Sequence, residues 1–109
     1  MNDAWYKVVY LRSNPETQIP SPLIATAKGE YDRQENKKDF CVFIAQNPLT
    51  VYFSPRAAEL CDDTLRLLAE PNHTDIEVSA CDVPTAEPSL KLMVGDCNDC
   101  HGLLNLRND

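Results

Sequence analysis

The sequence contains little glycine, and this scarcity excludes several kinds of nucleotide site. Only Gly29, Gly95 and Gly102 occur in 109 residues, so there is no glycine-rich loop of the dinucleotide-binding or P-loop kind. The patterns H-E-x-x-H and G-x-S-x-G, which mark zinc proteases and serine hydrolases, are absent as well. No motif therefore supports an enzymatic activity.

Long hydrophobic segments are also lacking. No run approaches the roughly 18 apolar residues that a membrane-spanning helix needs, and the first residues, MNDAW, are not a basic stretch followed by an apolar one. We therefore predict a cytoplasmic protein without a membrane partner. In a reducing cytosol, we expect the five cysteines to be thiols or metal ligands rather than disulfides.

Basic residues are few, and their distribution along the chain is uneven. The whole chain has 10 Lys and Arg against 17 Asp and Glu, a net charge of −7. Residues 1–56 carry a net charge of +1, from seven basic and six acidic residues, whereas residues 57–109 carry −8, from three basic and eleven acidic residues. Such a chain is repelled by nucleic acid phosphates. Its acidic half is either a solvated surface that favours solubility or a surface that binds a basic protein.

The composition is that of a globular protein, with 43% hydrophobic and 25% charged residues. The length fits a single domain over residues 1–109. We expect an α+β fold, with a mostly antiparallel sheet of about five or six strands and one main helix packed on one face. The expected strands cover residues 5–11, 23–31, 40–46, 50–53, 75–83 and 90–94, with a bend near Gly29 in the second and a hairpin that joins 40–46 to 50–53. The segment 40–46, FCVFIAQ, is apolar on both faces and is the expected central strand.

The clearest helix signal covers residues 54–70. Ser54 is suited to cap free amide groups, Pro55 suits the first helical position, and Pro71 marks the end. Helical spacing predicts that the buried side of this helix carries Ala57, Leu60, Cys61, Thr64, Leu65, Leu67 and Leu68. The polar segment 32–39 is expected to be a mobile loop, and residues 102–109 a C-terminal tail.

The segment Cys97-Asn98-Asp99-Cys100-His101 has the pattern C-x-x-C-H. It resembles the haem attachment site of c-type cytochromes, although both methionines, Met1 and Met93, lie upstream of it. We expect no cofactor, and zinc is the alternative, since two thiolates at this spacing can bind one tetrahedral ion. A redox dithiol is a third interpretation. The zinc ligands would be Cys81, Cys97, Cys100 and His101, with His73 as a substitute for His101.

The exposed side of the predicted helix and the strand that follows it are rich in carboxylates. Our main hypothesis is a small acidic, non-enzymatic domain that covers a basic surface on a protein partner. Its size and charge are similar to those of inhibitors such as phage anti-defence proteins and immunity proteins. A zinc-binding or thiol redox protein that uses the C-x-x-C-H segment is the alternative function. The predicted partner-binding residues are Glu59, Asp62, Asp63, Glu70, Asp75 and Glu77.

Overall fold

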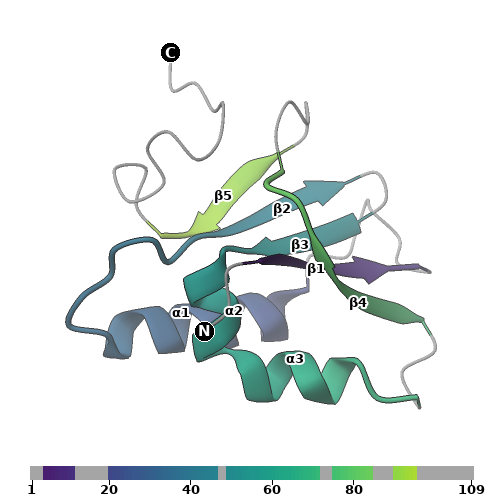
Figure 1. Cartoon of the computed structure of the whole chain (residues 1–109), viewed down its shortest axis with the longest axis horizontal. Helices are drawn as coiled ribbons and strands as arrows, with labels where there is room; N and C mark the ends of the chain where they lie inside the picture. The colour runs from purple at the N-terminus through teal and green to yellow at the C-terminus, as the bar shows by residue number, and fades with distance from the viewer. Residues whose placement is uncertain (1–3, 12–19, 47–48, 72–74, 85–89, 96–109) are drawn as a thin grey trace.

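The computed structural model describes residues 4–11, 20–46, 49–71, 75–84 and 90–95. They form a five-stranded antiparallel sheet in the order β4-β1-β3-β2-β5, with the helices beneath one face (Figure 1). The predicted α+β fold with a mostly antiparallel sheet is therefore confirmed. The elements are β1 (Trp5–Tyr10), α1 (Ser21–Arg33), β2 (Val42–Gln46), β3 (Leu49–Phe53), α2 (Pro55–Leu60), α3 (Asp62–Leu68), β4 (Ile76–Cys81) and β5 (Lys91–Val94).

The strand predicted over residues 23–31 is wrong, because this segment belongs to helix α1. Pro22 lies in the first turn, where its missing N–H costs no hydrogen bond. Leu23 and Ala27, one helical turn apart, are the buried residues that face the sheet. Gly29, which we interpreted as the site of a bend, lies on the open surface of the helix, where an added Cβ would meet nothing within 4 Å.

The polar segment 32–39 is partly helical and continues into a turn that closes α1. Asp32 and Arg33 are the last residues of the helix. Lys37 Nζ donates to the carbonyl oxygens of Tyr31 (2.9 Å) and Gln34 (2.6 Å) and lies 5.0 Å from the centre of the Tyr31 ring. A cation at this end of a helix satisfies carbonyl groups that have no partner within the helix.

The helix predicted over residues 54–70 is present as two shorter helices, so the single main helix of our prediction is wrong. The helix is interrupted at Cys61, whose φ of −104° and ψ of 21° are not helical. The break gives α3 a different direction from α2 and changes which residues are buried. Leu67, which we predicted to be buried, is 57% exposed, whereas Ala58 is buried.

The N-terminus of α2 is held by the Ser54 side chain, as predicted. Its buried hydroxyl accepts hydrogen bonds from the amides of Ala57 (3.3 Å) and Cys41 (3.0 Å) and donates to the carbonyl oxygen of Asp39 (2.7 Å). One hydroxyl thus caps the helix and fastens the segment that enters β2. This connection fixes α2 against the sheet.

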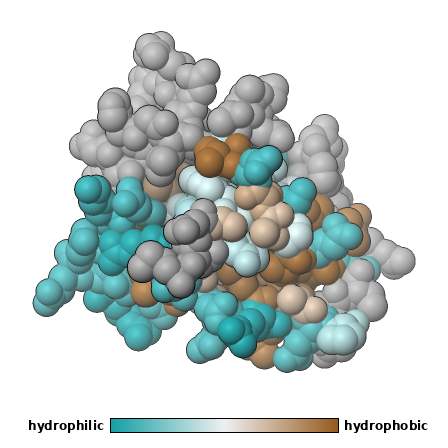
Figure 2. Space-filling model, in the orientation of Figure 1, coloured by the Kyte–Doolittle hydropathy of each residue, from teal (hydrophilic) through white to brown (hydrophobic). Residues whose placement is uncertain are grey.

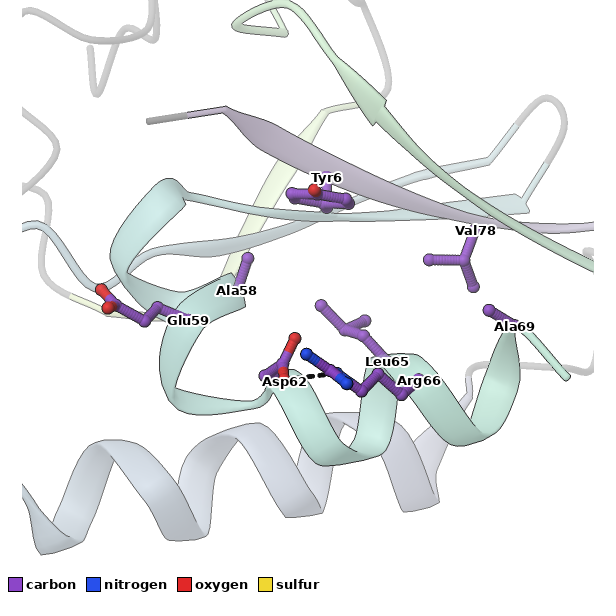
Figure 3. Close-up of a pocket in the computed structure, with 8 residues that line it drawn as sticks. All are labelled: Tyr6, Ala58, Glu59, Asp62, Leu65, Arg66, Ala69 and Val78. Atoms are coloured by element: carbon purple, nitrogen blue, oxygen red, sulfur yellow. Dashed lines mark hydrogen bonds and ion pairs between the residues drawn. The ribbon is translucent and has the colours of Figure 1, made fainter. Parts of the chain in front are cut away.

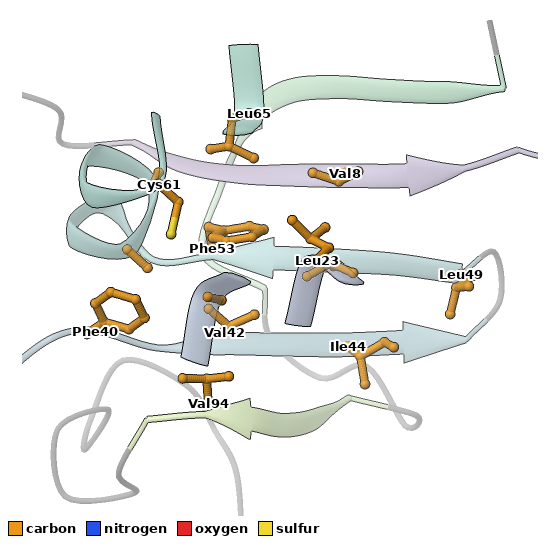
Figure 4. Close-up of a cluster of buried hydrophobic side chains, with 14 residues drawn as sticks. Val8, Leu23, Phe40, Val42, Ile44, Leu49, Phe53, Cys61, Leu65 and Val94 are labelled. Atoms are coloured by element: carbon orange, nitrogen blue, oxygen red, sulfur yellow. The ribbon is translucent and has the colours of Figure 1, made fainter. Parts of the chain in front are cut away.

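The main core lies between the helices and the sheet (Figure 4). Figure 4 shows side chains of β1, β2, β3 and β5 directed toward those of α1 and α3. The fully buried phenylalanines Phe40 and Phe53 are its largest members. Each buried aromatic or aliphatic side chain of this kind stabilises the fold by about 1.5–3 kcal/mol relative to exposure.

A second cluster lies on the opposite face of the sheet and consists of Trp5, Cys41 and Phe43. The rings of Trp5 and Phe43 are 6.2 Å apart. Strand β2 is therefore buried on both faces, as predicted, although β3 and not β2 is the middle strand of the sheet. Burial on both faces explains why this segment has a continuous apolar run rather than an alternating pattern.

The described cysteines are in two states. Cys61 and Cys81 are free thiols, as expected, whereas Cys41 is disulfide-bonded. The expectation that all five cysteines are thiols or metal ligands is therefore wrong for Cys41. Disulfides are rare in the reducing cytosol, so this bond does not support the cytoplasmic location, which remains a prediction.

Candidate functional site

A groove of about 700 Å³ lies between the paired helices α2 and α3 and the strands β1 and β4 (Figure 3). Its apolar lining consists of Ala58, Leu65 and Ala69 on the helix side and Val78 on the sheet side, where the half-buried ring of Tyr6 also lies. Figure 2 shows hydrophobic atoms exposed between the sheet and the hydrophilic atoms over α3. Helix α3 contacts β4, and the groove opens between this helix, α2 and the strands β1 and β4.

Charged side chains border this groove on the helix side. Glu59 and Asp62 line it, and both are exposed. Arg66, one helical turn after Asp62, donates from Nε to the Asp62 carboxylate at 2.6 Å. With side-chain exposures of 79% for Arg66 and 51% for Asp62, this pair is a surface ion pair, which water screens strongly. A basic group of a partner can therefore compete for the Asp62 carboxylate.

Two further predicted residues belong to the same stretch of the chain but do not line the groove. Asp63 is exposed in the first turn of α3, and Glu70 is exposed just beyond the last turn. Four of the predicted partner-binding residues therefore belong to the segment of α2 and α3, namely Glu59, Asp62, Asp63 and Glu70.

The other two predicted residues belong to β4 and its approach. Asp75 precedes the strand, and its carbonyl oxygen accepts a hydrogen bond of 2.8 Å from the amide of Leu11. Glu77 is exposed, but the neighbouring Val78 lines the groove on the helix side of the sheet. Because successive side chains of a strand point to opposite faces, Glu77 faces away from the groove. The six carboxylates therefore lie on both sides of the β4 edge rather than on one face.

Sequence reasoning missed the apolar part of this site. Tyr6 and Val78 come from strands far apart in the sequence, and Ala58 was not placed on the buried side of its helix. The register that pairs Tyr6 with Ala80 brings β1 and β4 side by side. The alternating pattern of β4 signals one apolar face, but it does not indicate that this face borders a groove beside α2 and α3.

A second, smaller groove of about 360 Å³ lies where α1 and α3 meet β1. It is mostly apolar and is lined by residues that include Tyr10, Leu23 and Leu68. Burial raises the pKa of the Tyr10 hydroxyl above its ordinary value. Among the described residues, no charged side chain lines this groove, so it offers fewer contacts to a polar ligand.

Of the predicted zinc ligands, only Cys81 is among the residues that the structure describes. Cys97, Cys100 and His101, together with the substitute His73, lie outside the described residues. Cys81 is a half-buried free thiol at the end of β4, and burial raises its pKa while nearby Lys7 lowers it in part and Asp82 raises it. Within the described ranges, no three His, Cys, Asp or Glu side chains are placed to hold a metal ion.

Comparisons with protein-family models, curated proteins and solved structures find no match to this chain. In the part of the chain that the structure describes, no helix combines the length and the apolar character that crossing a membrane requires. The function is therefore argued from the site alone.

Proposed function

We propose that this chain is a small acidic, non-enzymatic protein-binding domain that covers a basic surface on a protein partner. The groove between α2, α3 and the sheet supports this proposal, since it combines apolar lining residues with the exposed carboxylates Glu59 and Asp62. Protein interfaces are commonly built in this way, with an apolar centre and a charged rim. Inhibitors of the phage anti-defence or immunity type act by covering a partner's surface, and we propose that the chain acts in this way in the cytoplasm.

The charge distribution supports a basic partner rather than a nucleic acid. Residues 57–109, which include α3, β4 and the part of α2 that follows Arg56, carry a net charge of −8. Arg66 is the only basic residue among 57–71 and 75–84, and it is already paired with Asp62. A negative surface of this kind speeds encounter with a positive partner and repels phosphate groups.

The test is capture of a partner from an extract of the native host, with three forms of the chain as bait. The double variant Glu59→Lys/Asp63→Lys reverses charge on the helix side of the site. Glu35→Lys is the control for reversal of a surface charge elsewhere, because Glu35 is exposed in the connection between α1 and β2. Circular dichroism confirms that each bait is folded.

We expect the wild type and Glu35→Lys to retain the same partner, and the double variant to lose most of it. The retained complex should also weaken as salt rises, because exposed charge pairs are screened. Equal recovery by all three baits would contradict a role for this acidic surface. A captured partner that is a nucleic acid would contradict the proposal as well.

A further inference from the structure

Strand β4 is an edge strand whose outer side has no pairing strand in the described part of the chain. The sheet order places β4 beside β1 alone. None of its six residues is buried, in contrast to the other edge strand, β5, which ends at the buried Val94. An exposed edge of this kind is a template for strand pairing.

The register identifies which backbone groups face outward. Leu11 lies opposite Asp75 in continuation of the β1–β4 register, and the Leu11 amide donates to the Asp75 carbonyl oxygen. In an antiparallel pair, hydrogen-bonded residues alternate with residues whose N–H and C=O point the other way. Asp75, Glu77, Ser79 and Cys81 therefore bond to β1. The N–H and C=O groups of Ile76, Val78 and Ala80 point outward, away from the sheet.

The acidic residues of this edge disfavour pairing with a second copy of the chain. Asp75, Glu77 and Asp82 are exposed along it, and residues 75–84 contain no Lys or Arg. Two copies would bring only negative charges together, which destabilises cross-strand pairing. The same charges complement a strand that carries basic side chains.

We propose that the β4 edge binds an extended segment of a protein partner by adding it as a sixth strand to the sheet. This inference rests on the proposed function and names how the partner is held. A partner residue opposite Glu77 would form a close, non-hydrogen-bonded pair, so Lys or Arg is preferred there. Its neighbour opposite Val78 would point to the helix side, next to the groove that Val78 lines, so an apolar residue is preferred there. The recognised segment therefore alternates basic and apolar residues.

The probe is a fluorescent, end-blocked octapeptide of alternating Lys and Val, titrated by anisotropy against variants of the full chain. Val78→Pro removes one outward N–H without removing a donor to β1. Val78→Thr is its matched control, because it retains this N–H and the branched shape. We expect Val78→Pro to weaken binding about tenfold and Val78→Thr to change it less than about threefold.

Equal binding by Val78→Pro and wild type would overturn the inference. A dimer of the wild type in sedimentation velocity that Val78→Pro abolishes would also overturn it, since the occupant would be a second copy. Loss of peptide binding in Glu59→Lys/Asp63→Lys but not in Val78→Pro would overturn strand addition while leaving the proposed function intact.

Amide hydrogen exchange on the wild type keeps the inference testable if Val78→Pro fails to fold. In the free chain, the amides of Ile76, Val78 and Ala80 should exchange faster than those of Glu77 and Ser79, which donate to β1. Bound peptide should slow exchange at the first three. Unchanged exchange at these three amides under saturating peptide would overturn the inference.

Discussion

The inner strands β2 and β3 and the edge strand β4 are buried to very different extents. In β2 and β3, all but one residue of each strand is buried, and side chains pack on both faces. In β4, no residue is buried, and the helix side of this strand opens into a groove. The first region is a scaffold of aromatic and aliphatic side chains. The second region is thinly covered and acidic, which is what a binding surface on a rigid support requires.

Ser54→Ala changes the buried region around β2 and β3, and we expect it to have the largest effect on the free energy of unfolding. The change removes the acceptor for the amides of Cys41 and Ala57 and the donor to Asp39. Because these groups are desolvated around a fully buried side chain, we expect the free energy of unfolding to fall by about 2–4 kcal/mol in urea denaturation.

Thr26→Ala is the control for Ser54→Ala. The Thr26 hydroxyl donates to the Pro22 carbonyl oxygen within α1 and is exposed, so its loss should change stability by less than about 0.5 kcal/mol. Similar effects of the two variants would show that Ser54 is not a special point of connection.

Gly95 and Gly29 differ in the space that surrounds them, and substitution of each should have the opposite effect on stability. Gly95 has a φ of +122°, and an added Cβ would lie 2.5 Å from the Phe40 carbonyl oxygen. We expect Gly95→Ala to destabilise the chain by about 1–3 kcal/mol. Gly29→Ala, in an exposed helix position with open space around it, should stabilise by about 0.5–1 kcal/mol. Thermal unfolding of both variants tests this, and the same sign in both would contradict it.

The junction of α2 and α3 predicts a loss of stability at alkaline pH. Burial, and to a lesser extent the charge of Glu30, raises the pKa of the Cys61 thiol from 9.0 to about 11. The unfolded chain therefore releases this proton first, so the contribution of the thiol is fully present below pH 9 and is lost as pH rises toward 11. Cys61→Ala should show a shallower fall of Tm over this range. Tyr10 and Cys81, whose pKa values are also raised, should keep part of the fall of Tm with pH in this variant. A fall of Tm as steep as that of the wild type would contradict burial of the Cys61 thiol.

Arg66→Ala should have the smallest effect on stability, and it changes the charges beside the groove. The exposed pair with Asp62 contributes only about 0.2–0.5 kcal/mol. Its removal leaves the Asp62 carboxylate unpaired beside the groove, so binding of a basic partner should strengthen about twofold to threefold. The dissociation constant of the captured partner checks this, and weaker binding would show that Arg66 itself contacts the partner.

The sequence predicts the scaffold better than the binding side. The apolar run of β2, the hairpin with β3 and the cap at Ser54 depend on neighbouring residues, and the structure contains all three. Helix α1 was mistaken for a strand because its buried residues, such as Leu23 and Ala27, are few and Gly29 suggested a bend. In that segment, the burial of Leu23 and Ala27 on one face favours a helix, and Gly29 lies within it without bending the chain into a strand.

The candidate site is harder to predict because it depends on contacts between distant segments. The exposed carboxylates could be listed from the sequence, and all six are exposed. Their separation by the β4 edge, and the groove between Tyr6, Leu65 and Val78, depend on the sheet order and on how α2 and α3 pack against β1 and β4. Neither of these has a local sequence signal.

Carbodiimide cross-linking of the captured complex tests most directly whether the acidic side is the binding side. This reagent joins carboxylates to lysines that touch them, and mass spectrometry identifies the joined residues. We predict cross-links to the partner from Glu59, Asp63, Glu70 and Glu77. Cross-links that come instead from Asp32, Glu35 and Asp39, at the far end of α1 and the turn that follows it, would contradict the account.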